Sequence, residues 1–396
     1  MTKKIGLIRK KFLTRERLML IVEYLVRNEK QKNWTLAQET RWLSFMSKYD
    51  IDGIWQRLRY RTWEPKPFIV FDKQEGHKVR RIYESDPDDL VVDTLLLDCL
   101  NYVFLEQKHI VPSTCYGSIA GKGQHELRAD IIRLVHGRSD LFAFVGDTSK
   151  YYPTIDQDVL MNTFRQHIKD EWLLWLCEKC ITRIEGMKGI ALGLPSSNPI
   201  GHIYHSIIDW FVVLTMKVRR YYRFCDDKWA FHRDVNYLHT VAREIRDKTL
   251  CDLHQTMKHN WRIVYCKEER FECLGAMVNS HNARLKSYSR RRIERNIKKR
   301  ICEADQKKAL RTWGGIKGSL VNLSVSNLIC YWQEVYPEFF RLCYLERHEL
   351  AYQRRRKKWH TKMEKNLIYA IDKRSEENKI KYPYYGLIDI TQRKTA

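Results

Sequence analysis

The chain has 396 residues, enough for two or three packed units, and its 44% hydrophobic and 12% aromatic content excludes wholesale disorder. Seventy-two Lys and Arg residues against 48 Asp and Glu residues give a formal charge of +24, which favours a polyanionic partner. The sequence shows neither an uninterrupted apolar span of about 20 residues nor a basic helix with a clean apolar face, so we expect no membrane contact.

The N-terminal residues and the cysteines indicate the compartment. Basic residues recur through residues 3–17 and interrupt any signal-peptide core, so we expect a cytoplasmic protein. Eleven cysteines are scattered without regular spacing, as is typical of reduced thiols. The close pair Cys177 and Cys180 lies in an apolar run, and no second ligand pair follows at zinc-site spacing. Burial in a helix is therefore favoured over zinc binding.

The predicted elements begin with helices in residues 1–60, where apolar positions recur at helical spacing and indicate one buried face. These positions include Leu18, Leu20, Ile21, Tyr24 and Leu25. Residues 66–72 and 79–83 are β-rich runs on either side of Gly76, which predicts a hairpin. Residues 89–105 carry apolar residues near one stripe, which predicts a long amphipathic helix.

The next segments change in composition. Residues 116–125 are rich in glycine, and a helix is predicted to follow them as far as Val135. From about Ala283 onward the chain becomes basic and helical, with dense basic runs at residues 289–300 and 354–358. This change predicts a domain boundary at Ala283. The sequence has no internal repeat, which argues against a solenoid.

Acidic residues lie where two predicted β elements end. The short apolar run at residues 141–147 ends on Asp147, as a buried strand does when it delivers a carboxylate to a site. Residues 221–232 predict a hairpin with Asp226 and Asp227 at its turn. A lone acid at a strand end is usually a turn residue. Asp147 and Asp226 together suit nucleotidyl transfer, in which carboxylates hold two Mg²⁺ ions, or Mn²⁺ in their place.

Five motifs occur in a fixed order along the middle of the chain. Residues 147–156 (DTSKYYPTID) resemble the first palm motif of bacterial reverse transcriptases, and residues 222–227 (YRFCDD) resemble their aromatic-x-Asp-Asp motif. Residues 193–199 (GLPSSNP), between these two, resemble the template- and nucleotide-binding motif. Residues 116–125 (YGSIAGKGQH) are similar to a Gly-Lys/Arg-Gly-x-His element of group II intron-like and diversity-generating retroelement enzymes, and residues 271–275 (FECLG) resemble the primer-grip turn.

The resemblance, which extends from about residue 66 to residue 300, implies an α+β fold of the right-hand polymerase type. Such a fold has fingers, a ferredoxin-like antiparallel palm and a helical thumb. The implied domains are an N-terminal helical extension at residues 1–60, fingers at 61–140, a palm with finger-linked helices at 141–282, and a basic helical thumb with a C-terminal extension at 283–396.

The resemblance also implies roles for single residues. Asp147 and Asp226 would be the main catalytic metal ligands, with Asp227 as the accompanying acid. Tyr152 matches the aromatic residue that excludes a ribose 2′ hydroxyl and so selects dNTPs, and the alternative is a core aromatic. Arg80 would contact the incoming triphosphate, because a guanidinium group binds phosphate through several donors.

Lys258 lies where the family often has a basic residue that protonates the leaving pyrophosphate. For Arg80 and Lys258 alike, the alternative is a solvated charge. Template binding falls to Pro195, Ser196 and Ser197. The histidines near these motifs are expected to pack or to contact the backbone rather than to bind metal; they are His125, His202 and His205.

Two features depart from the family pattern. Ser196 and Ser197 stand where most reverse transcriptases have Gln-Gly and diversity-generating enzymes have an aliphatic residue and Gly. Losing the glycine removes backbone freedom beside the template base. Asp88 and Asp89 lie in a helix that normally carries basic residues. Neither change touches the three acids, but both leave the lineage open.

The function that the resemblance implies is an RNA-directed DNA polymerase that extends a 3′ end on an RNA template with dNTPs. Three settings remain open: a diversity-generating retroelement with an accessory RNA-binding protein, a phage-defence enzyme, and a group II intron-like enzyme. The alternative is a non-catalytic or untemplated polymerase-fold protein that binds RNA. The sequence leaves the oligomeric state undetermined.

Overall fold

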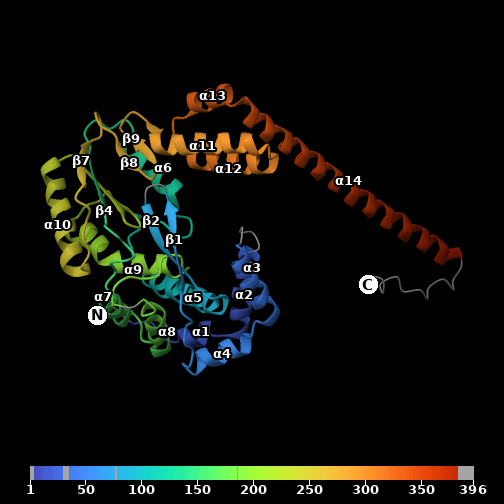
Figure 1. Ribbon diagram of the computed structural model, residues 1–396, viewed down its shortest axis with the longest axis horizontal. Helices are drawn as coiled ribbons and strands as arrows, with labels where there is room; N and C mark the ends of the chain where they lie inside the picture. Colours follow the sequence, from blue (N-terminus) through green and yellow to red (C-terminus); the bar gives the residue numbers. More distant parts are fainter. Residues whose placement is uncertain (1–3, 30–34, 76–77, 185, 382–396) are drawn as a thin grey trace. The chain divides into compact units, whose positions relative to one another are not determined.

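The structure is a computed structural model that describes residues 4–29, 35–75, 78–184 and 186–381. Helices predominate and the strands form small sheets, so the fold class is α+β (Figure 1). The chain divides into two compact units, Met1–Arg284 and Leu285–Ala396. No helix in the described ranges is both long and apolar enough to cross a bilayer.

The first unit begins with four helices, α1 (Ile8–Phe12), α2 (Arg15–Glu29), α3 (Leu36–Lys48) and α4 (Ile51–Arg59). The predicted N-terminal helices are therefore confirmed. In α2, Leu18, Ile21 and Leu25 are buried, whereas Leu20 and Tyr24 are 58% and 59% exposed. The prediction that Leu20 and Tyr24 share the buried face was wrong, because at about 100° per residue these two positions lie opposite the Leu18 stripe.

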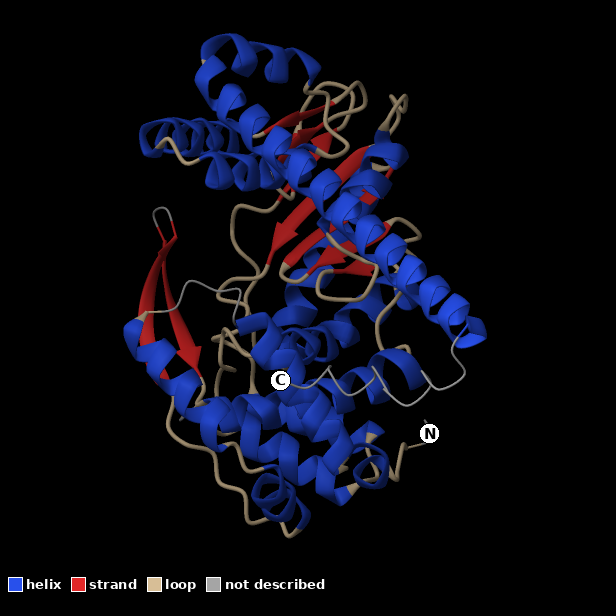
Figure 2. Ribbon diagram, turned by 90° about the vertical axis from the view of Figure 1, so that its right-hand side faces the viewer, coloured by secondary structure: helices blue, strands red, loops and turns tan. Residues whose placement is uncertain are grey.

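The predicted hairpin is confirmed as β1 (Ile69–Glu75) paired antiparallel with β2 (Lys78–Glu84). Its predicted turn residue, Gly76, lies outside the described residues. Arg80 lies on β2 directly across from Lys73. These two strands form a sheet of their own, separate from the other strands (Figure 2).

A largely buried helix runs through the centre of the first unit. Asp86 caps helix α5 (Pro87–Leu100): its side chain accepts a hydrogen bond from the Asp88 amide, and proline lies in the first turn. A π-helical segment, η1 (Asn101–Gln107), continues it. The predicted helix at residues 89–105 is thus confirmed, with a change of helix type at residue 101. Its predicted amphipathic character was wrong, because consecutive residues such as Val91 to Leu96 are all buried.

The largest sheet has five strands in the order β3-β5-β6-β4-β7. They are β3 (Cys115–Tyr116), β4 (Phe142–Asp147), β5 (Tyr221–Phe224), β6 (Asp227–His232) and β7 (Arg262–Tyr265). Only the β3–β5 pair is parallel. The predicted strand at residues 141–147 and the predicted hairpin at residues 221–232 are therefore both confirmed.

Further helices complete the first unit. They are α6 (Gln124–Val135), α7 (Gln157–His167), α8 (Glu171–Ile181), α9 (Ser197–Trp210) with its π-helical end η2 (Phe211–Thr215), and α10 (Val235–Leu253). Helix α6 confirms the helix predicted to end near Val135. Helix α10 contacts β4, β6 and β7, and Phe144 and Ala230 of the sheet share its hydrophobic core. Because side chains alternate along a strand, Asp147 and Asp227 lie on the opposite face from Phe144 and Ala230.

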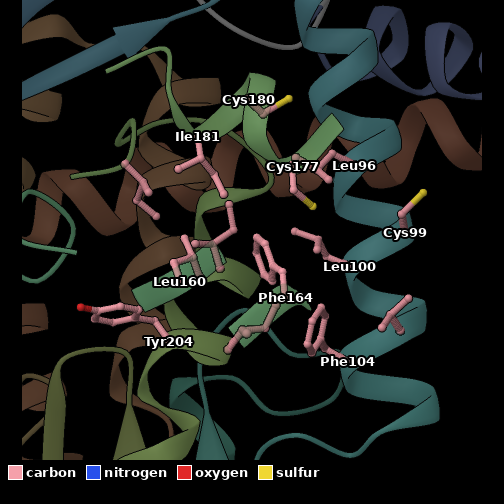
Figure 3. Close-up of a cluster of buried hydrophobic side chains, with 14 of the residues drawn as sticks. Leu96, Cys99, Leu100, Phe104, Leu160, Phe164, Cys177, Cys180, Ile181 and Tyr204 are labelled. Atoms are coloured by element: carbon pink, nitrogen blue, oxygen red, sulfur yellow. The ribbon is translucent and has the colours of Figure 1, made fainter. Parts of the chain in front are cut away.

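The main core lies between α5, α7, α8 and α9, and side chains from these helices point toward one another (Figure 3). Phe104 and Phe164 pack with their ring centroids 5.5 Å apart. Cys177 and Cys180 lie in α8, and both are buried. Their predicted burial in a helix is confirmed.

A three-stranded sheet ends the first unit, with β8 (Phe271–Cys273), β9 (Ala276–Val278) and β10 (Ala283–Leu285) in the order β10-β9-β8. The second unit consists of α11 (Ser287–Glu303), α12 (Gln306–Leu320), α13 (Ser326–Val335) and α14 (Pro337–Lys381). It has its own hydrophobic core, which includes Ile297, Trp313, Trp332 and Phe339. The predicted basic helices are confirmed: residues 289–300 lie in α11, and residues 354–358 lie exposed on α14.

Phe164→Ala is expected to lower the free energy of unfolding by about 3–5 kcal/mol, because it leaves a cavity in the main core. Leu20→Ala, at an exposed position of α2, is expected to change it by less than about 0.5 kcal/mol. Urea denaturation followed by circular dichroism measures both. Similar losses in the two variants would contradict this assignment of core and surface.

Candidate active site

The β4–β6 register brings the predicted acids to one end of the five-stranded sheet. Asp147, the last residue of β4, lies directly opposite Asp227, the first residue of β6. Directly opposed residues on neighbouring antiparallel strands have Cβ atoms about 4.5–5.5 Å apart. Asp226 precedes Asp227 in the turn between β5 and β6. All three carboxylates therefore lie within one small region.

Backbone hydrogen bonds hold the turn that carries Asp226. Cys225 adopts a left-handed conformation with φ of 51°, which reverses the chain between the two strands. The Thr148 amide donates to the Asp226 carbonyl at 3.2 Å, and the Lys258 amide donates to the Asp147 carbonyl at 2.8 Å. The two acid-bearing segments are thus bonded to each other and to the segment before β7.

A fully buried ion pair supports the turn from behind. The Arg223 guanidinium donates to both carboxylate oxygens of Asp209, on α9, at 2.7–3.0 Å. It also donates to the Cys225 carbonyl at 3.0 Å, and the Tyr221 hydroxyl donates to Asp209 at 2.9 Å. Removing one partner of a buried ion pair costs about 3–5 kcal/mol, so this pair holds β5 firmly against α9.

His202 completes this buried network. Its Nδ1 accepts a hydrogen bond from Arg223 at 3.2 Å, and its Nε2 lies against the Gly117 carbonyl. Burial and the neighbouring Arg223 charge lower the pKa of His202 to about 3, so the ring is neutral. The prediction that His202 contacts the backbone is confirmed. His205 packs on Tyr151 and bonds to Gln255 at 2.8 Å, and His125 lies 3.3 Å from an Arg128 nitrogen.

Asp147 has one bonded and one unbonded carboxylate oxygen. Its Oδ2 forms an ion pair with the Lys258 ammonium. Its Oδ1 is buried and has no hydrogen-bond partner among the described residues. A buried carboxylate oxygen without a donor is costly, which favours a cation as its missing partner.

The pKa values of the two neighbouring acids are raised because the acids are buried and negative charges are crowded there. Burial, together with the charges of Asp226 and Asp147, raises the pKa of Asp227 to about 7. Burial and Asp147 also raise the pKa of Asp226. Such displaced pKa values on adjacent acids are typical of functional sites.

Sequence reasoning missed Lys228, which lies directly beneath the acids. Its side chain is fully buried, and its ammonium donates to the Thr148 hydroxyl at 2.6 Å and to the Asp226 carbonyl at 3.2 Å. Burial and the Arg223 charge lower the pKa of Lys228 to about 8. Reasoning from the sequence also missed Arg223 and Asp209. The available signal was that Arg223 and Lys228 are the basic residues among the aromatic and apolar residues that flank the two acids in this hairpin.

Tyr152 lies near both the Asp226 charge and the Arg80 charge. The Tyr152 hydroxyl donates to Asn198 Oδ1 at 2.6 Å, and the Tyr151 ring packs edge-on against it with centroids 4.9 Å apart. Burial raises the pKa of Tyr152, the charges of Cys225 and Asp226 add to this effect, and Arg80 opposes it. Tyr152 therefore lies within electrostatic reach of both the Asp-Asp turn and the β1–β2 hairpin.

The predicted template-binding residues lie at the start of α9. Ser196 is buried, and its hydroxyl and amide both donate to Asp93 of α5, at 2.6 and 3.0 Å. The buried Ser197 hydroxyl donates to the Ala191 carbonyl. Both hydroxyls therefore bond within the protein, whereas Pro195 is only partly buried. Burial raises the pKa of Asp93 to about 6 despite the two bonds from Ser196.

Within the described ranges, no group of three or more His, Cys, Asp or Glu side chains is arranged to hold a metal ion on its own. The Asp147 oxygen without a donor and the crowded acids nevertheless fit hard cations whose remaining ligands come from a phosphate-bearing substrate. No protein-family model matches the chain, and no curated protein matches it.

Asp227→Asn is expected to stabilise the protein at pH 8 by on the order of 2 kcal/mol. Because the folded-state pKa of Asp227 is raised to about 7, its contribution to stability is complete below about pH 4 and is lost as the pH rises through 7. The difference in the free energy of unfolding between variant and wild type should therefore disappear near pH 4.

Urea denaturation between pH 4 and pH 8 without divalent cations measures this gap. Asp158→Asn, at an exposed position of α7, is the matched control and should leave the pH dependence unchanged. If the free energy of unfolding of Asp227→Asn differs from that of the wild type by the same amount from pH 4 to pH 8, the crowding of the three acids is contradicted.

Proposed function

We propose that the protein is an RNA-directed DNA polymerase that extends a 3′ end with dNTPs on an RNA template. The observation that carries this proposal is the β4–β6 register, with Asp147 opposite Asp227 and Asp226 in the adjoining turn. Nucleotidyl transfer needs carboxylates grouped in this way at a rigid position. The support therefore comes from the site, since an α+β fold by itself hosts many activities.

Asp147, Asp226 and Asp227 would hold two Mg²⁺ ions, or Mn²⁺ in their place. The donor-free Oδ1 of Asp147 and the raised pKa values of the other two acids support this assignment, because a cation supplies the missing partner and offsets the repulsion. When bound, the ions activate the attacking hydroxyl and neutralise the triphosphate.

In this proposal Lys258 has two roles, one before the reaction and one when pyrophosphate leaves. Its ammonium is paired with Asp147, which holds that carboxylate in place. Its side chain remains about one-third exposed, so it is accessible to a substrate. An ammonium beside the triphosphate is able to donate a proton to the departing pyrophosphate.

Tyr152 and Arg80 form the nucleotide side of the proposed site. The bond from Tyr152 to Asn198 fixes the ring, which lies within reach of the Asp226 charge. A fixed ring at this position would exclude a ribose 2′ hydroxyl and select dNTPs. Arg80, exposed on β2, would bind the triphosphate through its several donors.

Residues 193–195 offer a site for the template strand. The Tyr83 amide donates to the Leu192 carbonyl at 3.0 Å, which ties this loop to β2. Gly193 has φ of 119°, and an added Cβ there would lie 3.0 Å from the Tyr83 carbonyl, so only glycine fits. Beside the loop lies a cavity of about 490 Å³ whose lining includes Phe71, Leu194 and Pro195. Template contact would fall to this loop and to the backbone of Ser196 and Ser197.

The wider architecture proposed is a right-hand polymerase. Residues 1–60 would form an N-terminal extension, 61–140 the fingers, 141–282 a ferredoxin-like palm, and 283–396 a thumb whose basic helices grip the template–primer duplex. The exposed cations of α11 and α14 support an electrostatic grip of this kind. A diversity-generating retroelement with an accessory RNA-binding protein, a phage-defence system and a group II intron-like element are the settings in which such an enzyme would work.

Asp226→Ala and Asp147→Asn are each expected to lower kcat at least about a thousandfold, because each removes a proposed metal ligand. Extension of a primed RNA template with dNTPs and Mg²⁺ measures this loss. Asp158→Asn should retain wild-type activity. If the Asp226 and Asp147 variants extend the primer as well as the control does, the polymerase proposal is wrong.

Tyr152→Ala is expected to raise the kcat/KM for rNTPs relative to dNTPs by roughly a hundredfold, because the ring no longer excludes the 2′ hydroxyl. Tyr152→Phe keeps the ring, loses the bond to Asn198 and should stay selective for dNTPs. Single-nucleotide extension with each substrate measures the ratio. An unchanged ratio in Tyr152→Ala would assign Tyr152 to packing alone.

A further inference from the structure

The end of the β5–β6 hairpin remote from Asp226 and Asp227 carries a hollow of about 470 Å³ with a strongly basic lining. Its polar lining residues are Lys217, Arg219, Arg220, His232 and Arg233, and we refer to it as the basic hollow. These residues come from the segment before β5 and from the end of β6. Asp227 and His232 are the two ends of β6, so the hollow lies about 17 Å along this strand from the acids.

The positive charge in the basic hollow is only partly neutralised. Asp140, at its edge, pairs with Arg233 and lies 3.4 Å from Arg138. The side chains of Lys217, Arg219 and Arg220 form no hydrogen bond or ion pair with any described residue. Burial and the like charges of Arg138 and Arg233 lower the pKa of Arg220. Grouped cations of this kind favour a ligand with several negative charges.

An aromatic platform borders the cations. The exposed His232 ring lies 4.4 Å from the Tyr237 ring, centroid to centroid. The Asp234 amide donates to His232 Nδ1 at 3.0 Å, which fixes the ring orientation and leaves the proton of the neutral ring on Nε2. Exposed rings beside a positive groove are the usual means of binding unpaired bases and their phosphates together.

The apolar lining of the hollow argues against a lipid surface as the ligand. Val218 and Phe231 line it, and each is only 2% exposed. Membrane-surface binding needs apolar side chains that are free to insert. The hollow thus offers cations and a ring but no exposed apolar anchor among its lining residues.

We propose that the basic hollow binds an unpaired stretch of polynucleotide, with phosphates on Lys217, Arg219 and Arg220 and one base stacked on His232. Its position along β6 puts the bound stretch away from the three acids, so it holds nucleic acid outside the reacting centre. The proposal concerns binding and does not depend on the proposed catalysis. RNA and DNA share the required chemistry, and the experiment distinguishes them.

The first test neutralises the hollow with Lys217→Gln, Arg219→Gln and Arg220→Gln in one variant. The matched control carries Arg165→Gln, Lys169→Gln and Arg243→Gln, three exposed cations elsewhere in the first unit. Fluorescence anisotropy measures the Kd for labelled oligo(U) and oligo(dT) of about eight nucleotides at several KCl concentrations, without divalent cations or dNTPs.

The slope of log Kd against the logarithm of the salt concentration is expected to be about 2 smaller in the hollow variant than in the wild type. Each phosphate contact on a single strand contributes about 0.7 to this slope, and the variant loses three such contacts. The control should keep the wild-type slope. Preference for oligo(U) identifies RNA as the natural strand, and preference for oligo(dT) identifies DNA. Equal slopes in the hollow variant and the control would overturn the proposal.

The second test isolates the base contact with His232→Ala. This variant is expected to bind the oligonucleotides about tenfold more weakly, because stacking on the ring is lost. Its affinity for inorganic polyphosphate, which has no bases, should be unchanged. Photo-crosslinking of a 4-thiouridine oligonucleotide should label the peptide that contains His232.

Absence of that crosslink, or an equal loss of polyphosphate binding in His232→Ala, would overturn the proposal. These binding assays contain neither divalent cations nor dNTPs, so failure of the polymerase proposal is distinguishable from failure of this one. Circular dichroism of each variant verifies that it is folded.

Discussion

The electrostatic repulsion among Asp147, Asp226 and Asp227 is the constraint around which the first unit is organised. Like charges on directly opposed strand positions destabilise a sheet. The structure offsets the repulsion with positive groups: Lys258 pairs with Asp147, and Lys228 lies beneath the turn with its ammonium on the Asp226 carbonyl. The register that creates the repulsion is itself secured, because a slip of one residue would move Asp147 to the core face.

Helix α9 connects the parts of the proposed site. Ser196 immediately precedes it and bonds to Asp93 of α5, and Asn198 in its first turn holds the Tyr152 hydroxyl. Asp209, near its other end, holds Arg223 beneath the acidic turn. One rigid helix therefore sets the position of the loop at residues 193–195, the Tyr152 ring and the acids relative to one another. A site on regular elements is held more precisely than one built on loops alone.

The β5–β6 hairpin has opposite charge at its two ends. The turn carries Asp226 and Asp227, whereas the basic hollow at the other end carries Lys217, Arg219 and Arg220. The negative end suits cations, and the positive end suits phosphates. A single hairpin thus places a proposed reaction site and a proposed strand-holding site at a fixed separation, which suits a protein that must keep a long polyanion in place while it acts on one end.

Most of the elements, and the acids that they carry, follow from the order of the amino acids. Apolar runs that end on Asp147 and surround Asp226 predicted the strand and the hairpin, because burial on one or both faces leaves a strong local pattern. The basic α11 and the β1–β2 hairpin were likewise readable from local composition. The local pattern predicted the wrong face for two residues of α2. Leu20 and Tyr24 are apolar, but their side chains are exposed on the outer side of the helix.

Folding determines which distant residues meet. Asp147 and Asp227 are opposed because β4 and β6 are neighbours, which no local pattern encodes. Asp209, Arg223 and Lys228 are ordinary charges in the sequence, yet long-range packing buries all three beneath the turn. Folding also places the Ser196 hydroxyl on Asp93, because a buried carboxylate needs a hydrogen-bond donor, and the local sequence gives no sign of this contact.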